Sequence, residues 1–185
     1  MIKVNLSNYD QSWYSKGRSS IVIIFWWFVQ ASFFSCSLHN MYNYRNFILR
    51  LFGAKIGKGV KVRASARFHY PWKIEIGDYS WIGDHAQLYS LDRIKIGSNC
   101  VISQDAYLCT GSHDLESESF QLIVKPIIIE DYAWVAADTF VAQGVTIKEG
   151  GVIAARSSIY KDTEPWWVYM GNPAKSIKKR EIVRK

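Results

Sequence analysis

A short polar segment, residues 110–126, interrupts a regular repeat of aliphatic residues and carries a side chain suited to acid–base chemistry, His113. An imidazole has a pKa near neutrality, so His113 can remove a proton from a hydroxyl group while that group attacks a substrate. Asp114, Glu116 and Glu118 follow closely, and a carboxylate bonded to one ring nitrogen would hold the other ready as a base. Asp114 is the nearest candidate for that role, and the alternative is that these carboxylates are solvated loop charges. We predict that this interruption is the active site.

Cys109 directly precedes the segment and could act as a nucleophile, because a thiolate beside a histidine can form a covalent acyl-enzyme intermediate. The alternative is a buried thiol, since Cys109 follows the inward-facing Leu108. The three cysteines, Cys36, Cys100 and Cys109, show neither a CxxC spacing nor a metal-finger arrangement. We therefore predict free thiols in a reducing cytosol and no metal site.

The elements that must position His113 are predicted by a six-residue period on both sides of the segment. This period fits neither a helix nor a flat strand, whereas hexapeptide repeats are typical of a solenoid whose chain turns a corner after each short strand. We interpret the two-residue additions at 74–76 and 94–96 as longer corners. The repeated positions are Ile56, Val62, Phe68, Ile74, Ile76, Ile82, Leu88, Ile94, Ile96, Ile102, Leu108, Ile129, Val135, Val141, Ile147, Ile153 and Ile159.

Small residues accompany this repeat. The position four after each aliphatic residue is mostly small, which suits a narrow prism with large side chains inside and small ones at tight corners. These positions are Ser80, Ala86, Cys100, Ala106, Ala133, Thr139, Gly151 and Ser157. Glycines directly after the aliphatic residue are expected at corners with unusual backbone angles; they are Gly57, Gly77, Gly83 and Gly97.

Two apolar segments precede the repeat. Residues 21–34 (IVIIFWWFVQASFF) are too short to cross a bilayer, and they could form a helix buried on the solenoid, an interfacial membrane helix or a subunit contact. Residues 41–52 predict an amphipathic helix ending at Gly53, with Tyr44, Phe47, Ile48 and Leu51 on its apolar face and Arg45 and Arg50 elsewhere. We expect an N-terminal helical region over 1–53, the solenoid over 54–164 and a C-terminal extension over 165–185.

Composition limits the function classes. The chain has 185 residues, is 49% hydrophobic and carries a formal charge of +7, so it can bury one core and should prefer an anionic partner such as nucleic acid, a membrane surface or a phosphorylated molecule. An alternative source of the charge is the basic C-terminal run KSIKKREIVRK. No signal peptide is expected, because no small-residue cleavage site follows the apolar run.

Three motifs together resemble the hexapeptide-repeat acyltransferases, most closely the O-acetyltransferases of the colanic-acid and maltose or galactoside type. They are TGSHD at 110–114, PIIIEDYAWVAADTFVAQGVTI at 126–147 and VYMGNPAKSIKKR at 168–180, and the resemblance covers residues 51–180. It implies a left-handed parallel β-helix, acetyl-CoA as co-substrate, direct transfer without a metal, and a homotrimer with each active site between two chains.

The resemblance also implies roles for individual residues. His113 matches the catalytic histidine of the motif. The family's C-terminal coils bind CoA, so the expected cofactor residues are Trp134, Ala137, Ala155, Lys161, Lys175 and Arg180. The galactoside-type asparagine in the coil before the histidine is absent here, so the candidates for the acceptor cleft and the oxyanion contact are His85, Tyr89 and Ser90.

The leading hypothesis is a cytoplasmic O-acetyltransferase, at the inner face of the membrane if the N-terminal segment contacts it, that acts on a sugar hydroxyl during surface polysaccharide assembly. No nucleic-acid partner is implied. A zinc carbonic anhydrase would need three converging histidines, which this sequence lacks in the active-site segment. The other alternative is a non-catalytic scaffold or membrane-docked partner in which His113 is idle.

Overall fold

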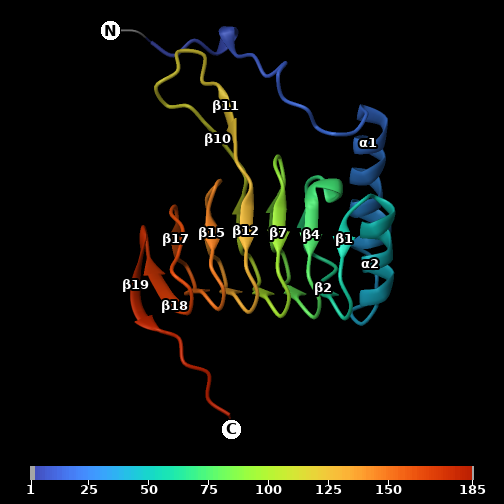
Figure 1. The fold of residues 1–185 in the computed structure, drawn as a ribbon. Coiled ribbons are helices and arrows are strands. Elements are labelled where there is room, and N and C mark those ends of the chain that lie inside the picture. Colours follow the sequence, from blue (N-terminus) through green and yellow to red (C-terminus); the bar gives the residue numbers. More distant parts are fainter. Residues whose placement is uncertain (1–2, 185) are drawn as a thin grey trace.

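The computed structural model describes residues 3–184 and consists of a stack of coils with short strands on three faces (Figure 1). The first face holds β1 (Lys55–Ile56), β4 (Ile74–Ile76), β7 (Ile94–Ile96), β12 (Ile127–Ile129) and β15 (Thr146–Ile147). The second face holds β2 (Lys61–Val62), β5 (Trp81–Ile82), β8 (Val101–Ile102), β13 (Trp134–Val135), β16 (Val152–Ile153), β18 (Trp167–Gly171) and β19 (Ala174–Lys179). The third face holds β3 (Arg67–Phe68), β6 (Gln87–Tyr89), β9 (Tyr107–Cys109), β14 (Phe140–Val141) and β17 (Ser158–Ile159).

The interior of the stack is filled by the predicted six-residue repeat. Every repeated position, from Ile56 to Ile159, is buried, with at most 9% of its surface exposed. Parallel pairing in register stacks like on like, as in the pair of Leu88 with Leu108. A fully buried aliphatic side chain stabilises the fold by about 1.5–3 kcal/mol relative to an exposed one. The small positions four residues later lie at the corners, directly before the next strand, as predicted, and they are buried too.

The first two-residue addition partly makes a longer corner, as the sequence suggested: residues 69–73, between β3 and β4, include the 3-10 helical turn Pro71–Lys73. The additions also lengthen the strands of the first face, so that Ile74 and Ile76 are both buried within β4, and Ile94 and Ile96 within β7. The reason is that side chains two apart on a strand share one face.

The glycines that follow the repeated aliphatic residues do not have the unusual backbone angles that the sequence predicted. Gly83 has an ordinary backbone angle, but a Cβ atom on it would lie 2.5 Å from the backbone nitrogen of Gln104 in the next coil. Gly57, Gly77 and Gly97 are crowded in the same way. The left-handed backbone angles fall instead on corner residues with side chains, among them His85 and Arg156.

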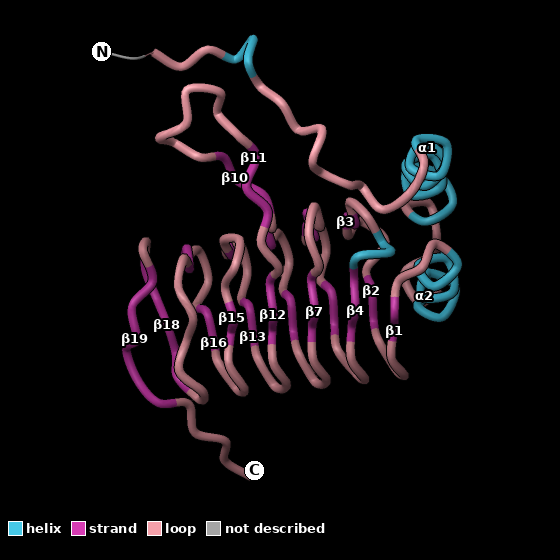
Figure 2. The backbone as a smooth tube through the Cα atoms, turned by 45° about the horizontal axis from the view of Figure 1, so that its top comes forward, coloured by secondary structure: helices cyan, strands magenta, loops and turns pink. Residues whose placement is uncertain are grey.

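Helices cover the first coil (Figure 2). Helix α1 (Ser20–Val29) continues as a π-helical turn (Gln30–Phe34), and α2 (Tyr42–Leu51) follows. Trp26 donates its indole N–H to the Phe68 carbonyl over 2.9 Å, and Gln30 accepts the Phe68 N–H over 2.7 Å. These bonds satisfy backbone groups that the end of a solenoid leaves without a strand partner.

Helix α2 presents a different face from the predicted one. Arg45 and Asn46 are buried and donate to the carbonyls of Val62 and Val60, whereas Phe47 and Leu51 point outward and are exposed. The unpaired carbonyls of the first coil need donors, so the polar side chains face the core. Among residues 3–184, no helix combines the length and the hydropathy needed to cross a membrane.

The C-terminal extension is part of the stack. Strand β18 pairs in parallel with β16 of the last coil, and β19 folds back on β18 in antiparallel pairing. In Figure 1 this hairpin lies at the end of the stack opposite the helices.

Candidate active site

The polar segment 110–126 leaves the stack as an antiparallel hairpin of β10 (Gly111–His113) and β11 (Leu122–Val124), which projects beyond the coils in Figure 1. Its base is fixed by Thr110, whose hydroxyl donates to the Tyr89 carbonyl over 2.7 Å and accepts the Asp92 N–H over 2.9 Å. The hairpin thus carries a polar segment outward from a rigid coil.

His113 ends β10 and is half-buried. Its ring stacks on Phe120, with 4.1 Å between the ring centres and 8° between the planes. Its Nδ1 lies 2.9 Å from the Phe120 carbonyl oxygen. A carbonyl can only accept a hydrogen bond, so Nδ1 carries the proton and Nε2 of the neutral ring presents its lone pair. This arrangement can perform general-base chemistry.

Asp114 does not hold the histidine tautomer in this structure. Its carboxylate accepts the Glu116 N–H over 2.9 Å, and among residues 3–184 no hydrogen bond joins it to the His113 ring. The Phe120 carbonyl takes the place that the sequence assigned to a carboxylate. No pattern of residue types could indicate this partner, because every residue has a backbone carbonyl.

Cys109 is buried, and its thiol lies 3.1 Å from the Gly111 carbonyl, to which it donates. A thiol held in this way is not presented to solvent as a nucleophile. The geometry favours a mechanism without a covalent cysteine intermediate.

A groove of about 1030 Å³ runs along the second face and its corner with the third. Four of the six predicted cofactor residues line it: Trp134, Ala137, Ala155 and Arg180. The alanine side chains are small, so a ligand in the groove can approach the backbone closely. Trp134 is fixed by donating its indole N–H to the Ser103 hydroxyl over 2.9 Å.

The cationic side of this groove differs from the prediction. Lys161 and Lys175 are exposed outside it, whereas Lys178 and Lys179 on β19 line it. Antiparallel pairing with β18 decides which lysines reach the groove, and the run KSIKKR by itself does not. Arg180 is partly engaged already, because its guanidinium donates to the Tyr132 and Gly150 carbonyls over 2.6 and 3.0 Å.

The three candidate acceptor residues lie in different places. His85 is exposed at a corner, 3.6 Å from the Asp105 carboxylate, and lines a second cavity of about 570 Å³. Tyr89 is half-buried against His69, 4.7 Å between ring centres, and burial raises the pKa of its hydroxyl. Ser90 is fully buried.

Ser90 has a structural role here. Its hydroxyl donates to the Tyr70 carbonyl over 3.1 Å and accepts the Tyr70 N–H over 2.9 Å. Both bonds tie two coils together, and burial keeps the hydroxyl from a substrate. This placement argues against the predicted acceptor role.

The groove and His113 occupy different corners of one chain. No residue of segment 110–126 lines the groove, because the hairpin leaves between the third and first faces. Among residues 3–184 there is also no group of three His, Cys, Asp or Glu residues placed to hold a metal ion.

The chain is 50% identical over 165 residues to a protein of Escherichia coli (strain K12) named for colanic acid biosynthesis, the acetyltransferase WcaF; the match spans 89% of this chain and 91% of that relative. It is 27% identical over 141 residues to the galactoside O-acetyltransferase of the same organism, spanning 75% of this chain and 68% of the relative. No protein-family model matches the sequence.

The fold matches that of a hexapeptide-repeat acetyltransferase, VCA0836 of Vibrio cholerae, solved in complex with acetyl-CoA. The TM-score is 0.82 at 24% identity, covering 91% of this chain and 92% of that one. This likeness confirms the predicted left-handed β-helix. The half-identical relative, matched over almost its whole length, shows in addition that the chain belongs to the hexapeptide-repeat acetyltransferases.

Proposed function

We propose that this acetyltransferase transfers an acetyl group from acetyl-CoA to a sugar hydroxyl during the assembly of a surface polysaccharide. Its relative is named for colanic acid biosynthesis, and a solved structure of the same fold contains acetyl-CoA. The groove is long, has small residues along its wall and carries Lys178 and Lys179 beside it, which suits a pantetheine arm and phosphates. The observation that carries the proposal is His113, whose Nε2 lone pair is free while Nδ1 is fixed.

In the proposed reaction, Nε2 of His113 removes the proton of the acceptor hydroxyl as its oxygen attacks the thioester carbonyl. The tetrahedral intermediate then collapses, the carbon–sulfur bond breaks, and the proton passes from the imidazolium to the CoA thiolate. The acetyl group reaches the sugar in one displacement within a ternary complex, without an acyl-enzyme. His85 and Tyr89 are the proposed contacts for the acceptor.

The proposal includes a homotrimer in which His113 of one protomer faces the groove of its neighbour. Its support is the separation of His113 from the groove within one chain, since an isolated chain would leave base and thioester apart. We place the enzyme in the cytoplasm, with its N-terminal apolar segment in peripheral contact with the inner face of a membrane.

A thiol-release assay with acetyl-CoA and a panel of saccharides tests the function. We expect acceptor-dependent release of CoA, and His113→Ala should lower kcat by about 10²–10⁴-fold, the usual contribution of a general base. Cys109→Ala should retain most of the turnover. A scaffold protein would release no CoA with any acceptor, and equal turnover of His113→Ala and the unmodified protein would exclude His113 as the base.

A further inference from the structure

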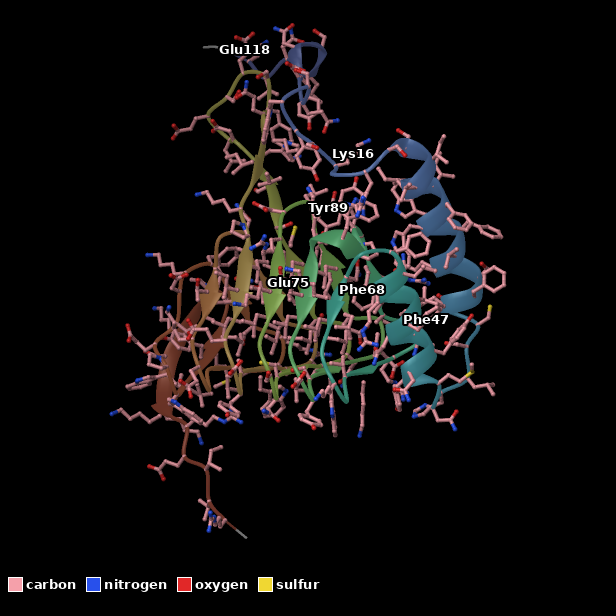
Figure 3. The ribbon with its side chains drawn as sticks, turned by 45° about the vertical axis from the view of Figure 1, so that its right-hand side comes forward. Lys16, Phe47, Phe68, Glu75, Tyr89 and Glu118 are labelled. Carbon is pink, nitrogen blue, oxygen red and sulfur yellow. The ribbon has the colours of Figure 1, made fainter. Side chains whose placement is uncertain are left out.

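The outer side of the helix pair carries a row of large apolar side chains. On α1, Ile21, Ile24, Phe25 and Phe28 follow the i, i+3, i+4, i+7 spacing of one helical face, and on α2, Phe47 and Leu51 are four residues apart. The ring of Phe25 lies 5.7 Å from that of Phe52, directly after α2, so the two helices meet. We call these six side chains the helix-pair surface; Figure 3 labels Phe47 on it and Phe68 in the coil beside it.

The helix-pair surface is open to solvent. Its six side chains are 56–79% exposed, whereas Ile23 and Trp26 on the inner side of α1 are buried. Packing on the coils therefore accounts for the apolar side chains on the inner side of α1, but not for those on its outer side. An exposed cluster of large apolar side chains is unusual in a soluble protein unless it contacts a partner.

The segment that carries this surface is basic. Residues 11–74 contain ten Lys and Arg residues and neither Asp nor Glu, so the positive charge of the chain originates here and not in the C-terminal run alone. Of these ten, Lys55 and Arg63 pair with Glu75 and Asp84 of the second coil, and Arg45 is buried. Arg18 lies beside Gly53 at the end of α2, and Arg50 is exposed on α2. Within residues 3–184, neither arginine forms a salt bridge.

We infer that the helix-pair surface docks on an anionic phospholipid bilayer. Aromatic and aliphatic side chains flanked by arginines and lysines, on helices too short to span, are the features of an interfacial helix. Anionic lipids attract such cations, whereas a second copy of this chain would bring two positively charged surfaces together. The inference deepens the membrane contact of the proposed function and rests on it.

The place of the helices sets the orientation of the docked enzyme. They cover the first coil, and the His113 hairpin leaves after the third coil (Figures 1 and 2). Neighbouring coils are about 4.8 Å apart, and a helix is about 10 Å across. These dimensions place the hairpin roughly 20 Å from the lipid. At that distance the hairpin stays accessible to substrates.

Vesicle co-sedimentation tests the inference with the full chain, using phosphatidylcholine vesicles with and without phosphatidylglycerol. We expect binding to the anionic vesicles only, and weaker binding as salt rises. The double variant Phe25→Ser and Phe28→Ser should bind at least about tenfold more weakly. Lys16→Glu with Arg18→Glu should lose about 25-fold or more, at roughly fivefold for each cation removed.

Matched controls are Tyr160→Ser and Lys95→Glu, which replace an exposed aromatic and an exposed lysine away from the helices and should bind as the unmodified chain does. Circular dichroism of every variant confirms folding. Equal binding to neutral and anionic vesicles, or no binding to either, overturns the inference. The inference is also overturned if the chain does not bind vesicles but self-associates, and the same phenylalanine changes abolish that self-association. Because the assay does not use acetyl transfer, loss of the proposed activity and loss of docking are separate outcomes.

Discussion

At the residue scale, the orientation of the His113 ring depends on a backbone carbonyl and a stacked phenyl ring. Phe120 provides both, since its carbonyl accepts from Nδ1 and its ring lies parallel to the imidazole. A carbonyl bond fixes the tautomer but adds less stabilisation to an imidazolium than a carboxylate would. The orientation of the proposed base therefore depends on the fold of the hairpin and not on one carboxylate side chain.

This geometry makes a prediction for Asp114. In Asp114→Asn the side-chain oxygen can still accept the Glu116 N–H, and no contact with the His113 ring is lost. We expect kcat to change by no more than about twofold, the range of a neutral surface substitution. Steady-state kinetics checks it, with His113→Ala as the inactive reference. A hundredfold loss would restore the carboxylate as an orienting group.

His69 makes the stability of the fold depend on pH. Burial, with Lys73 and Lys16 nearby, lowers the pKa of His69 below its ordinary value of 6.5. The unfolded chain therefore binds a proton that the folded chain does not, so this contribution to stability is complete above pH 6.5 and is lost as the pH falls below it. We expect His69→Gln to flatten the fall in unfolding free energy between about pH 7 and pH 5. Urea unfolding across this range measures it, and identical slopes would contradict it.

At the element scale, the hairpin that carries His113 is supported by the N-terminal segment 3–19. The Asn5 N–H donates to the Glu118 carbonyl over 2.8 Å, and the Tyr9 ring lies 5.9 Å from the His113 ring. Figure 3 labels Glu118 on the hairpin and Lys16 on this segment. The segment is anchored below by Tyr14, whose hydroxyl donates to the Leu91 carbonyl over 2.8 Å.

We predict that Tyr9 positions the ring of His113, the proposed base. Tyr9→Ala should lower kcat about tenfold or more, since small displacements of a catalytic group are costly, and should leave the KM for acetyl-CoA unchanged. Tyr9→Phe is the control and should be near normal, because within the described range, 3–184, the hydroxyl bonds only to Gln11, at 3.4 Å. Loss of activity in both variants would point to the hydroxyl and not to packing.

The close stacking of coils leads to a prediction for Gly83. A Cβ atom there would meet the backbone of the next coil, so Gly83→Ala should lower the free energy of unfolding by about 1–3 kcal/mol. The reverse exchange at a left-handed corner, Arg156→Gly, should change it by less than about 1 kcal/mol, because relief of strain offsets the flexibility gained. Denaturant unfolding of both variants measures the contrast, and equal effects would contradict it.

At the scale of the whole molecule, the separation of His113 from the groove makes the proposed site dependent on assembly. Ala155→Trp would fill the groove of a protomer, and His113→Ala would remove its base. Each variant alone should be inactive. When the two are unfolded and refolded together, random assembly pairs an intact groove with an intact base at roughly a quarter of sites, so about that share of activity should return. Mixtures that stay inactive would show that each site is built within one chain.

The spacing of aliphatic residues was enough to predict the solenoid, the residues that fill it and the place where it is interrupted. A period of six is a local property, and the burial of each repeated residue follows from the turn of each coil without reference to distant contacts. The resemblance to the acetyltransferases also identified four residues of the groove lining, Trp134, Ala137, Ala155 and Arg180, because the C-terminal coils of that family bind CoA.

Tertiary structure alone decided which backbone group orients His113, which lysines of the C-terminal run reach the groove and which side of α2 faces the core. Each depends on partners far apart in the chain or on unpaired carbonyls, such as those of Val60 and Val62 at the end of the stack. Side-chain pattern does not record where backbone acceptors are left unsatisfied. For that reason α2 buries Arg45 and Asn46 beside Ile48 and Leu49, whereas Phe47 and Leu51 are exposed.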